Sequence, residues 1–200
     1  MQSKIYFSDS GTDFSPGPDL PRPVEMVEWV QSIGYDTDVP QYHWLDTQVY
    51  AKSGLRSEVD FTHKDDNHGP VKNDRCVLGA INAGSRFYLA YFYNGAFCYG
   101  YSNLYSKAGS NIAEVPAVKG TRYFVESDLS VGNQSVKVND TEIHKDGVAH
   151  DATYFATGNT LTLFAVHTGK TGHTSYSSVR LFSTKIWDGD ELLRDFVPVV

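Results

Sequence analysis

The chain has few of the residues that disulfide-stapled, metal-bound or membrane-spanning proteins use. Only two of its 200 residues are cysteine, Cys76 and Cys98, and their spacing matches no zinc or redox motif. No apolar run approaches the ~20 residues that a membrane-spanning helix requires. The 17 lysines and arginines are outnumbered by 24 aspartates and glutamates, and the net charge of −7 disfavours nucleic acid and anionic membrane surfaces as partners.

The rest of the composition is that of a folded domain. The sequence is 40% apolar and 14% aromatic, which is enough for a sizeable core, and 200 residues fit one β-sandwich. We expect Cys76 and Cys98 to be buried thiols, with a single disulfide between them as the alternative. The first residues contain no apolar stretch typical of a signal peptide, so we expect a chain that is used without Sec export or has lost a leader.

Short strands and tight turns dominate the pattern. The dipeptides Asn94-Gly95, Asn139-Asp140 and Asp188-Gly189 each lie between apolar or alternating segments, as hairpin turns do, since such turns need positive φ. Strand-like segments recur every 8–12 residues or so, and no long helix is evident. The sequence therefore predicts an all-β fold, an antiparallel β-sandwich that covers residues 24–200.

The first 23 residues have a different composition. Residues 8–23 contain four of the eight prolines, and proline fixes φ and donates no backbone hydrogen bond. We therefore predict that residues 1–23 form an extended arm that does not join the sandwich. The apolar side chains of Ile5, Tyr6, Phe7 and Phe14 would anchor this arm on a partner or on another copy of the chain.

Aromatic residues suggest where a ligand would bind. A two-residue turn at Asn94-Gly95 would pair Phe92 with Phe97, Ala90 with Tyr99 and Tyr88 with Tyr101 on one face, which we assign to the core. The opposite face would carry Tyr91 and Tyr93, and Tyr105 follows in a polar stretch. These three tyrosines are candidates for stacking against sugars, with a second buried layer or an oligomer contact as the alternative. We expect Trp29, Trp44 and Trp187 to lie in the core.

Catalytic and metal motifs are weak. Glu58 and Asp60 share one strand face by alternation, as glycosidase carboxylates do, but positions 62 and 63 bring no third carboxylate. We therefore expect a solvated polar face and no catalytic residue. The loop at residues 63–73 holds two histidines, two aspartates and asparagines, from which a calcium site could be built. We expect no cofactor and no metal, with calcium as the alternative.

Several motifs resemble one family. These motifs are Tyr42-His-Trp-Leu-Asp-Thr, Cys76-Val-Leu-Gly-Ala, Phe87-Tyr-Leu-Ala-Tyr-Phe-Tyr, Leu161-Thr-Leu-Phe-Ala-Val and the closing segment from Lys185 to Val199. They are similar to the strands of concanavalin-A-like or laminin-G-like jelly-roll modules, which occur in phage structural proteins and bacterial surface proteins. The resemblance implies a jelly roll, and it points to binding or structure more than to catalysis because the matching residues are strand and turn residues.

The resemblance leads to a functional expectation. We expect a non-catalytic structural or adhesion module, a phage virion component such as a capsid decoration or tail protein, that contacts other virion or surface proteins, host glycans or further copies of itself. The alternatives are a secreted bacterial lectin-like domain, which would be extracellular or on the cell surface, and a glycoside hydrolase of the same fold.

Overall fold

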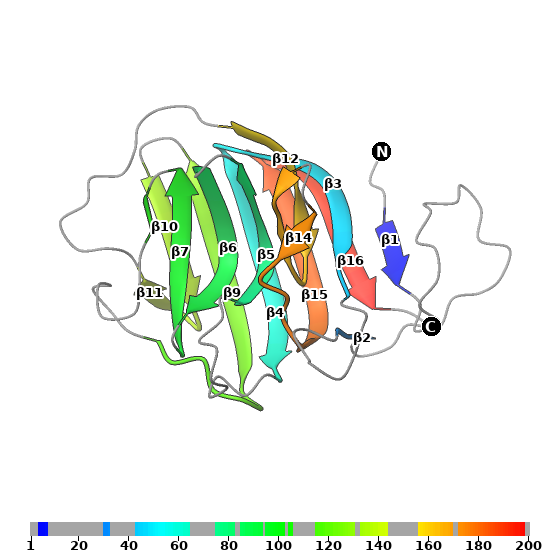
Figure 1. Cartoon of the computed structure of the whole chain (residues 1–200), viewed down its shortest axis with the longest axis vertical. Coiled ribbons are helices and arrows are strands. Elements are labelled where there is room, and N and C mark those ends of the chain that lie inside the picture. The colour runs from blue at the N-terminus through cyan, green and yellow to red at the C-terminus, as the bar shows by residue number, and fades with distance from the viewer. Residues whose placement is uncertain are drawn as a thin grey trace, which may run out of the picture.

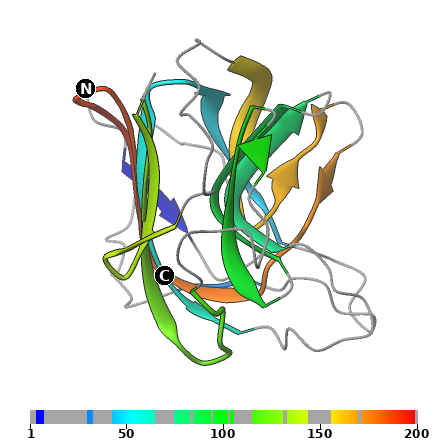
Figure 2. The same ribbon diagram turned by 90° about the vertical axis from the view of Figure 1, so that its left-hand side faces the viewer.

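The protein is a two-layered β-sandwich, as Figures 1 and 2 show for a computed structural model. The structure describes residues 4–7, 30–32, 43–64, 75–82, 85–93, 95–102, 104–105, 115–130, 133–143, 156–169 and 172–198. Within these residues the secondary structure is β-strand without α-helix, and no helix there could cross a membrane. The predicted all-β antiparallel sandwich is confirmed.

The first sheet contains the N-terminal and C-terminal strands. In spatial order it consists of β1 (Lys4–Phe7), β16 (Glu191–Pro198), β15 (Val179–Asp188), β4 (Leu55–His63), β9 (Arg122–Ser130), β10 (Asn133–Val138) and β11 (Thr141–Ile143), with β2 (Val30–Gln31) also paired to β15. Neighbouring strands are antiparallel except β1, which runs parallel to β16. Residues alternate along β4 between buried and part-exposed, so the sheet has one core face and one outer face.

The second sheet packs against the core face of the first. It consists of β14 (His173–Thr174), β13 (Val166–His167), β5 (Arg75–Asn82), β6 (Ser85–Tyr93), β7 (Ala96–Ser102) and β8 (Leu104–Tyr105), with β12 (Ala156–Leu163) paired to both β5 and β3 (Leu45–Lys52). Phe61 of the first sheet and Phe97 of the second are fully buried, and their ring centroids lie 6.3 Å apart. The core between the sheets thus combines aromatic contacts with a majority of aliphatic side chains.

The predicted turns exist, with one shift. Asn139 and Asp140 have φ of 47° and 65°, as a primed turn requires, and they join β10 to β11. In the closing hairpin Asp188 pairs with Glu191, so the two-residue loop is Gly189-Asp190 and not Asp188-Gly189. Gly189 has φ of 57° and supplies the positive φ at the first loop position. The predicted glycine is correct, but it occupies the first loop position and not the second.

The hairpin of β6 and β7 follows the prediction only near its turn. Phe92 pairs with Phe97 as expected, but the register shifts between Tyr88 and Tyr91. Beyond this irregularity Phe87, not Tyr88, pairs with Tyr101, so the predicted pairing of Tyr88 with Tyr101 is wrong. Phe87 is fully buried in the core. The reason is a β-bulge, which adds a residue to one strand and reverses the faces beyond it.

The two cysteines are not bonded to each other. Both thiols are reduced and buried, in a small second cluster with Val166. Cys76 and Cys98 both pair with Tyr91, on opposite sides of β6. Two strand spacings put their Cα atoms ~9–10 Å apart, beyond the ~7 Å that a disulfide tolerates. The expectation of two buried thiols is confirmed, and the alternative of a disulfide is not.

The N-terminal residues lie on the sandwich itself. Lys4–Phe7 forms a short parallel ladder in which Ile5 pairs with Phe196 and Tyr6 with Val197. Part of the expected arm therefore adds a strand to the edge of the first sheet beside β16. Residues 8–23, including Phe14, lie outside the described residues, and anchoring by the arm stays a prediction.

Candidate functional site

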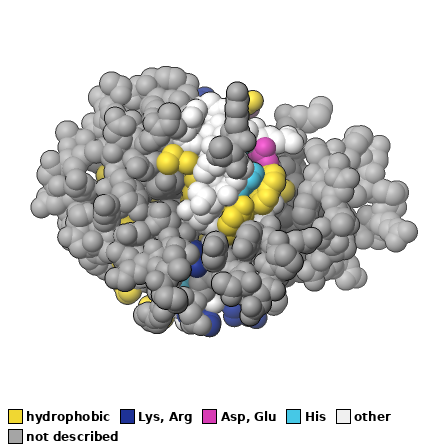
Figure 3. Space-filling model, in the orientation of Figure 1, with side chains coloured by type: hydrophobic (Ala, Val, Ile, Leu, Met, Phe, Trp, Pro, Cys, Tyr) yellow, Lys and Arg dark blue, Asp and Glu magenta, His cyan; other side chains and the backbone are white. Residues whose placement is uncertain are grey.

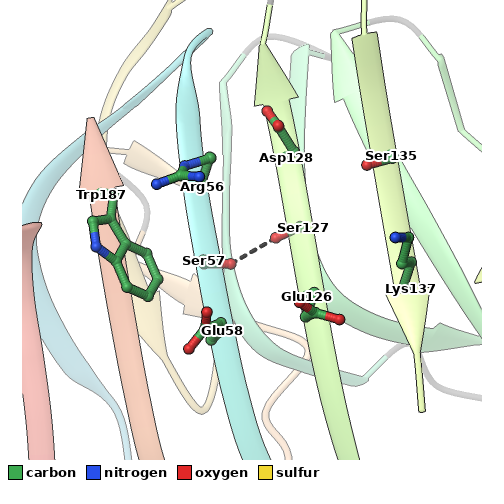
Figure 4. A pocket seen from close by; sticks show the side chains of 9 residues that line it. All are labelled: Arg56, Ser57, Glu58, Glu126, Ser127, Asp128, Ser135, Lys137 and Trp187. Carbon is green, nitrogen blue, oxygen red and sulfur yellow. Dashed lines mark hydrogen bonds between the residues drawn. The ribbon is translucent and has the colours of Figure 1, made fainter. Parts of the chain in front are cut away.

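A polar cavity of about 230 Å³ opens on the outer face of the first sheet. Its nine lining residues are Arg56, Ser57 and Glu58 of β4, Glu126, Ser127 and Asp128 of β9, Ser135 and Lys137 of β10, and Trp187 of β15 (Figure 4). Four adjacent strands thus contribute side chains to one site. Apart from Ser57 and Ser127, these residues belong to the outward-facing half of each strand.

A central pair of carboxylates lies between two lysines. Glu58 and Glu126 lie directly opposite each other in the β4–β9 ladder. On its other side Glu58 pairs with Lys185, and Glu126 pairs with Lys137. Directly opposite residues have Cβ atoms about 4.5–5.5 Å apart, so each carboxylate has both a like-charged and an oppositely charged neighbour. The two lysines offset the repulsion between the two glutamates.

Trp187 forms an aromatic wall beside these charges. It pairs with Arg56, whose guanidinium carbon lies 5.7 Å from the centre of the indole ring, within the range of a cation–π contact. Within the described part of the chain, the same guanidinium also makes a long ion pair, 3.9 Å to Asp190, and the Nε atom of Arg56 is buried without a hydrogen-bond partner. The Arg56 side chain as a whole is 42% exposed, so its terminal nitrogens rather than Nε can donate to a ligand. Trp187 is half-buried, so the prediction that it lies in the core is wrong.

A buried hydrogen bond fixes the floor of the cavity. Ser57 and Ser127 lie opposite each other on the core face, with relative exposures of 2% and 4%, and their hydroxyls are 2.6 Å apart. Figure 4 shows this bond between the strands that carry Glu58 and Glu126. Because a buried hydroxyl needs a partner, the bond holds β4 and β9 in one register and thereby fixes the spacing of the two glutamates.

Asp60 has a structural role near the cavity. It shares the outer face of β4 with Glu58, as alternation predicts. Arg122 donates two hydrogen bonds of 2.8 Å to its two carboxylate oxygens, and the same guanidinium lies 3.7 Å from the centre of the Phe182 ring. A carboxylate held in this bidentate way is occupied. Glu58 is therefore the carboxylate of β4 that is available to a ligand.

The tyrosine candidates belong to the second sheet. Tyr91 and Tyr93 lie in β6 and Tyr105 in β8, but their side chains lie outside the described ones. The structure does not bring these three residues into the cavity of the first sheet. Cys76 and Cys98, the cross-strand neighbours of Tyr91, are fully buried. Sugar stacking by these tyrosines stays a prediction.

The same holds for the other predicted sites. The side chains of Ile5, Tyr6 and Phe7 are not described, and of the proposed calcium loop only His63 and Lys64 are. Among the described residues no group of three or more His, Cys, Asp or Glu could hold a metal ion. Calcium at the loop of residues 65–73 therefore stays open.

Sequence reasoning found one member of the cavity and missed the rest. Alternation along one strand relates Glu58 only to residues of that strand, whereas the fold brings Glu126 and Asp128 to it from β9. The available signal was the alternation of polar and apolar residues around Glu126 and Asp128 and around Ser135 and Lys137. That signal assigns these residues to an outer face but does not say which strand lies beside them.

Comparison with known proteins identifies the fold. No protein-family model and no curated protein sequence matches the chain. Among solved structures, a heptameric SAP-like pentraxin from Limulus polyphemus superposes with a TM-score of 0.51 and 14% identity, covering 80% of this chain and 76% of its own. This likeness shows the fold alone.

Two further structures are more distant. A Trypanosoma rangeli sialidase mutant gives a TM-score of 0.47 at 13% identity over 67% of this chain, which spans only 20% of the sialidase. Mouse laminin α1 domains LG4-5 give 0.40 at 10% identity, covering 82% of this chain and 39% of theirs. Neither supports an argument about function. In its fold, the chain is a concanavalin-A-like or laminin-G-like jelly roll.

Proposed function

We propose that the chain is a non-catalytic glycan-binding module that uses the cavity of the first sheet. The observation that carries the proposal is the combination of Trp187 with planar hydrogen-bonding groups in one open cavity. The C–H face of a sugar packs on an aromatic ring, while carboxylate, guanidinium and ammonium groups orient its hydroxyls. Glu58, Glu126 and the partly exposed guanidinium of Arg56 suit this task.

The finer proposal is that the module belongs to a virion or cell surface. It is supported by the resemblance of the strand motifs to phage and bacterial surface modules and by the proline-rich N-terminal segment. The partners we propose are other surface proteins and further copies of the chain. The pentraxin with the same fold is heptameric, which is consistent with self-association. A secreted lectin-like domain would use the same cavity in a different compartment.

One observation favours a second candidate, a glycoside hydrolase. Retaining glycosidases need two carboxyl groups about 5 Å apart, and direct cross-strand pairing places the Cβ atoms of Glu58 and Glu126 about 4.5–5.5 Å apart. Such an enzyme needs one of the two protonated as an acid. Here Lys185 and Lys137 flank the pair, so cationic and anionic groups lie side by side, as suits the orientation of sugar hydroxyls in binding.

A glycan array tests the proposal. We expect the wild type to bind one class of glycan, with and without calcium, and Trp187→Ala to lose at least tenfold in affinity, which is about 1.4 kcal/mol. Phe124→Ala is the matched control, because Phe124 is another outward aromatic residue of the first sheet, 38% exposed and outside the cavity. Equal binding by wild type and Trp187→Ala would refute the assignment to this cavity.

A further inference from the structure

A stack of three rings lies on the outside of the second sheet, away from the cavity. The ring of Trp44 lies face to face on that of His173, with centroids 3.7 Å apart and planes within 18°. His173 stacks in turn on His167, at 5.0 Å and 17°. The two histidines face each other across the β13–β14 ladder, and Trp44 precedes β3.

Hydrogen bonds fix the inner end of this stack. Nδ1 of His167 lies 3.1 Å from both the carbonyl oxygen and the hydroxyl of Thr160. Thr160 pairs with Tyr50 of β3. Hydrogen bonding to Thr160 therefore fixes the imidazole of His167 against β12. Stacking on this imidazole in turn orients the rings of His173 and Trp44. A Trp ring held in this way loses little conformational entropy when a ligand packs on it.

Trp44 is exposed although its partners are not. Its relative exposure is 45%, so the prediction that it lies in the core is wrong, whereas His173 is part-buried beneath it. Burial, together with the nearby His167 and against the opposing effect of Asp46, lowers the pKa of His173 to about 4. His173 is therefore neutral at pH 7. Its Nε2 atom is buried without a hydrogen-bond partner, which is unusual for a group with only a structural role.

The outward face of β3 extends this platform. Trp44, Asp46, Gln48 and Tyr50 recur at every second position, and Thr47 and Val49 between them are buried. The strand is irregular here, because Gln48 has φ of 58° and the pairing with β12 shifts between Asp46 and Tyr50. Tyr50 is 64% exposed. Asp46 accepts a hydrogen bond of 2.7 Å from the backbone of Gln48, which fixes one carboxylate oxygen and leaves the other available. Figure 3 shows histidine and acidic side chains beside apolar ones over β14 and β3.

This array suits a sugar chain better than a protein partner. Two exposed aromatic rings are separated by a carboxylate and an amide, which can bond to hydroxyls between two stacked sugars. A protein interface would need a broader contiguous apolar patch. The described residues include two other large exposed hydrophobic side chains. Phe124 lies in β9 of the first sheet, and Val118 lies in the loop before β9.

The geometry points to a second glycan-binding surface along β3, with Trp44 and Tyr50 stacking on two sugar rings of a linear chain and Asp46 and Gln48 orienting hydroxyls between them. The surface belongs to the second sheet and does not depend on the cavity with Trp187. A linear polysaccharide could engage either site alone or both in turn. Two sites on one module would raise the avidity for a long chain above that of either site.

The experiment is affinity electrophoresis in gels that contain laminarin, galactan, glucomannan or inulin. The main comparison is between the wild type, Trp44→Ala, Trp187→Ala and the double variant, and further variants serve as controls. We expect Trp44→Ala to weaken binding to at least one polysaccharide about tenfold, both in the wild type and in the Trp187→Ala background. Trp44→Phe keeps an aromatic ring on the stack and should retain most of the affinity, and Phe124→Ala should bind as the wild type does.

Each other outcome counts against the second surface. Unchanged retardation of Trp44→Ala overturns it, even if Trp187→Ala has lost binding, and so does a wild type that none of the four polysaccharides retards. If Trp44→Ala melts at a lower temperature than the wild type, the Tyr50→Ala variant decides, because binding equal to that of the wild type overturns the proposal. Displacement of the polysaccharide by tetramethylammonium would instead identify a cation site.

Discussion

Protonation of His173 should couple stability to pH. The folded state holds the pKa of His173 at about 4 against an ordinary value of 6.5, because burial and the neighbouring His167 disfavour its charged form. Above pH 6.5 the residue is neutral in both states and contributes no pH dependence. Between pH 6.5 and 4 only the unfolded state binds the proton, so stability falls as the pH falls, and the effect levels off below pH 4.

The magnitude follows from the size of the shift. A pKa difference of this size changes the free energy of unfolding by about 3 kcal/mol across the full pH interval. The ring is only part-buried, so solvent screening reduces this change to about 1–2 kcal/mol. In urea denaturation, lowering the pH from 7.5 to 3.5 should reduce the free energy of unfolding of the wild type by this much more than that of His173→Phe. The variant keeps a stacked ring but cannot titrate. Exposed His43→Gln is the control and should follow the wild type. Parallel curves for wild type and His173→Phe would refute the reasoning.

Three further predictions concern the first sheet. Glu58→Gln should change stability by less than about 0.5 kcal/mol, and the wild type should release no reducing ends from β-glucans; hydrolysis that this variant abolishes would establish the enzyme. Deleting residues 1–22 removes β1 and should lower the melting temperature by about 2–4 °C or less while abolishing attachment or assembly; unfolding with assembly intact would refute the anchoring role of the arm. Ser57→Ala should cost about 1–3 kcal/mol in urea denaturation, and adding Ser127→Ala should cost less than a second loss of that size, since the double variant leaves no buried hydroxyl unpaired; additive costs would contradict a coupled pair.

The sequence predicts strands best where alternation and turn residues agree. Along β4 and β9 every second residue is buried, and Asn139-Asp140 forms the turn between β10 and β11, so the local pattern and the fold coincide there. The pattern fails where the backbone departs from regular geometry. Phe164 adopts φ of 70° between β12 and β13, so the apolar run from Leu161 to Val166 is two strands and not one. No residue type in that run marks the break.

The candidate site could not be predicted because its residues are brought together by strand order. Glu58 meets Glu126, Lys137 and Trp187 only because β9 and β15 flank β4 and β10 lies beside β9. Alternation tells which face a residue occupies, but strand neighbours in a jelly roll are distant in sequence. The same limit applies to Trp44, whose exposure depends on His173 of β14. Hydrophobicity alone favoured the core for both tryptophans.

The two proposed surfaces share one design. On β4, outward Glu58 belongs to the cavity while its neighbour Val59 is fully buried, and on β15 the half-buried Trp187 follows the fully buried Ile186. Because the side chains of a strand alternate, one residue stabilises the core while the next is available for binding. The outer faces can therefore change their ligand specificity without repacking the interior. The core-facing half of each strand can therefore determine the fold while the outward half determines what the proposed surfaces bind.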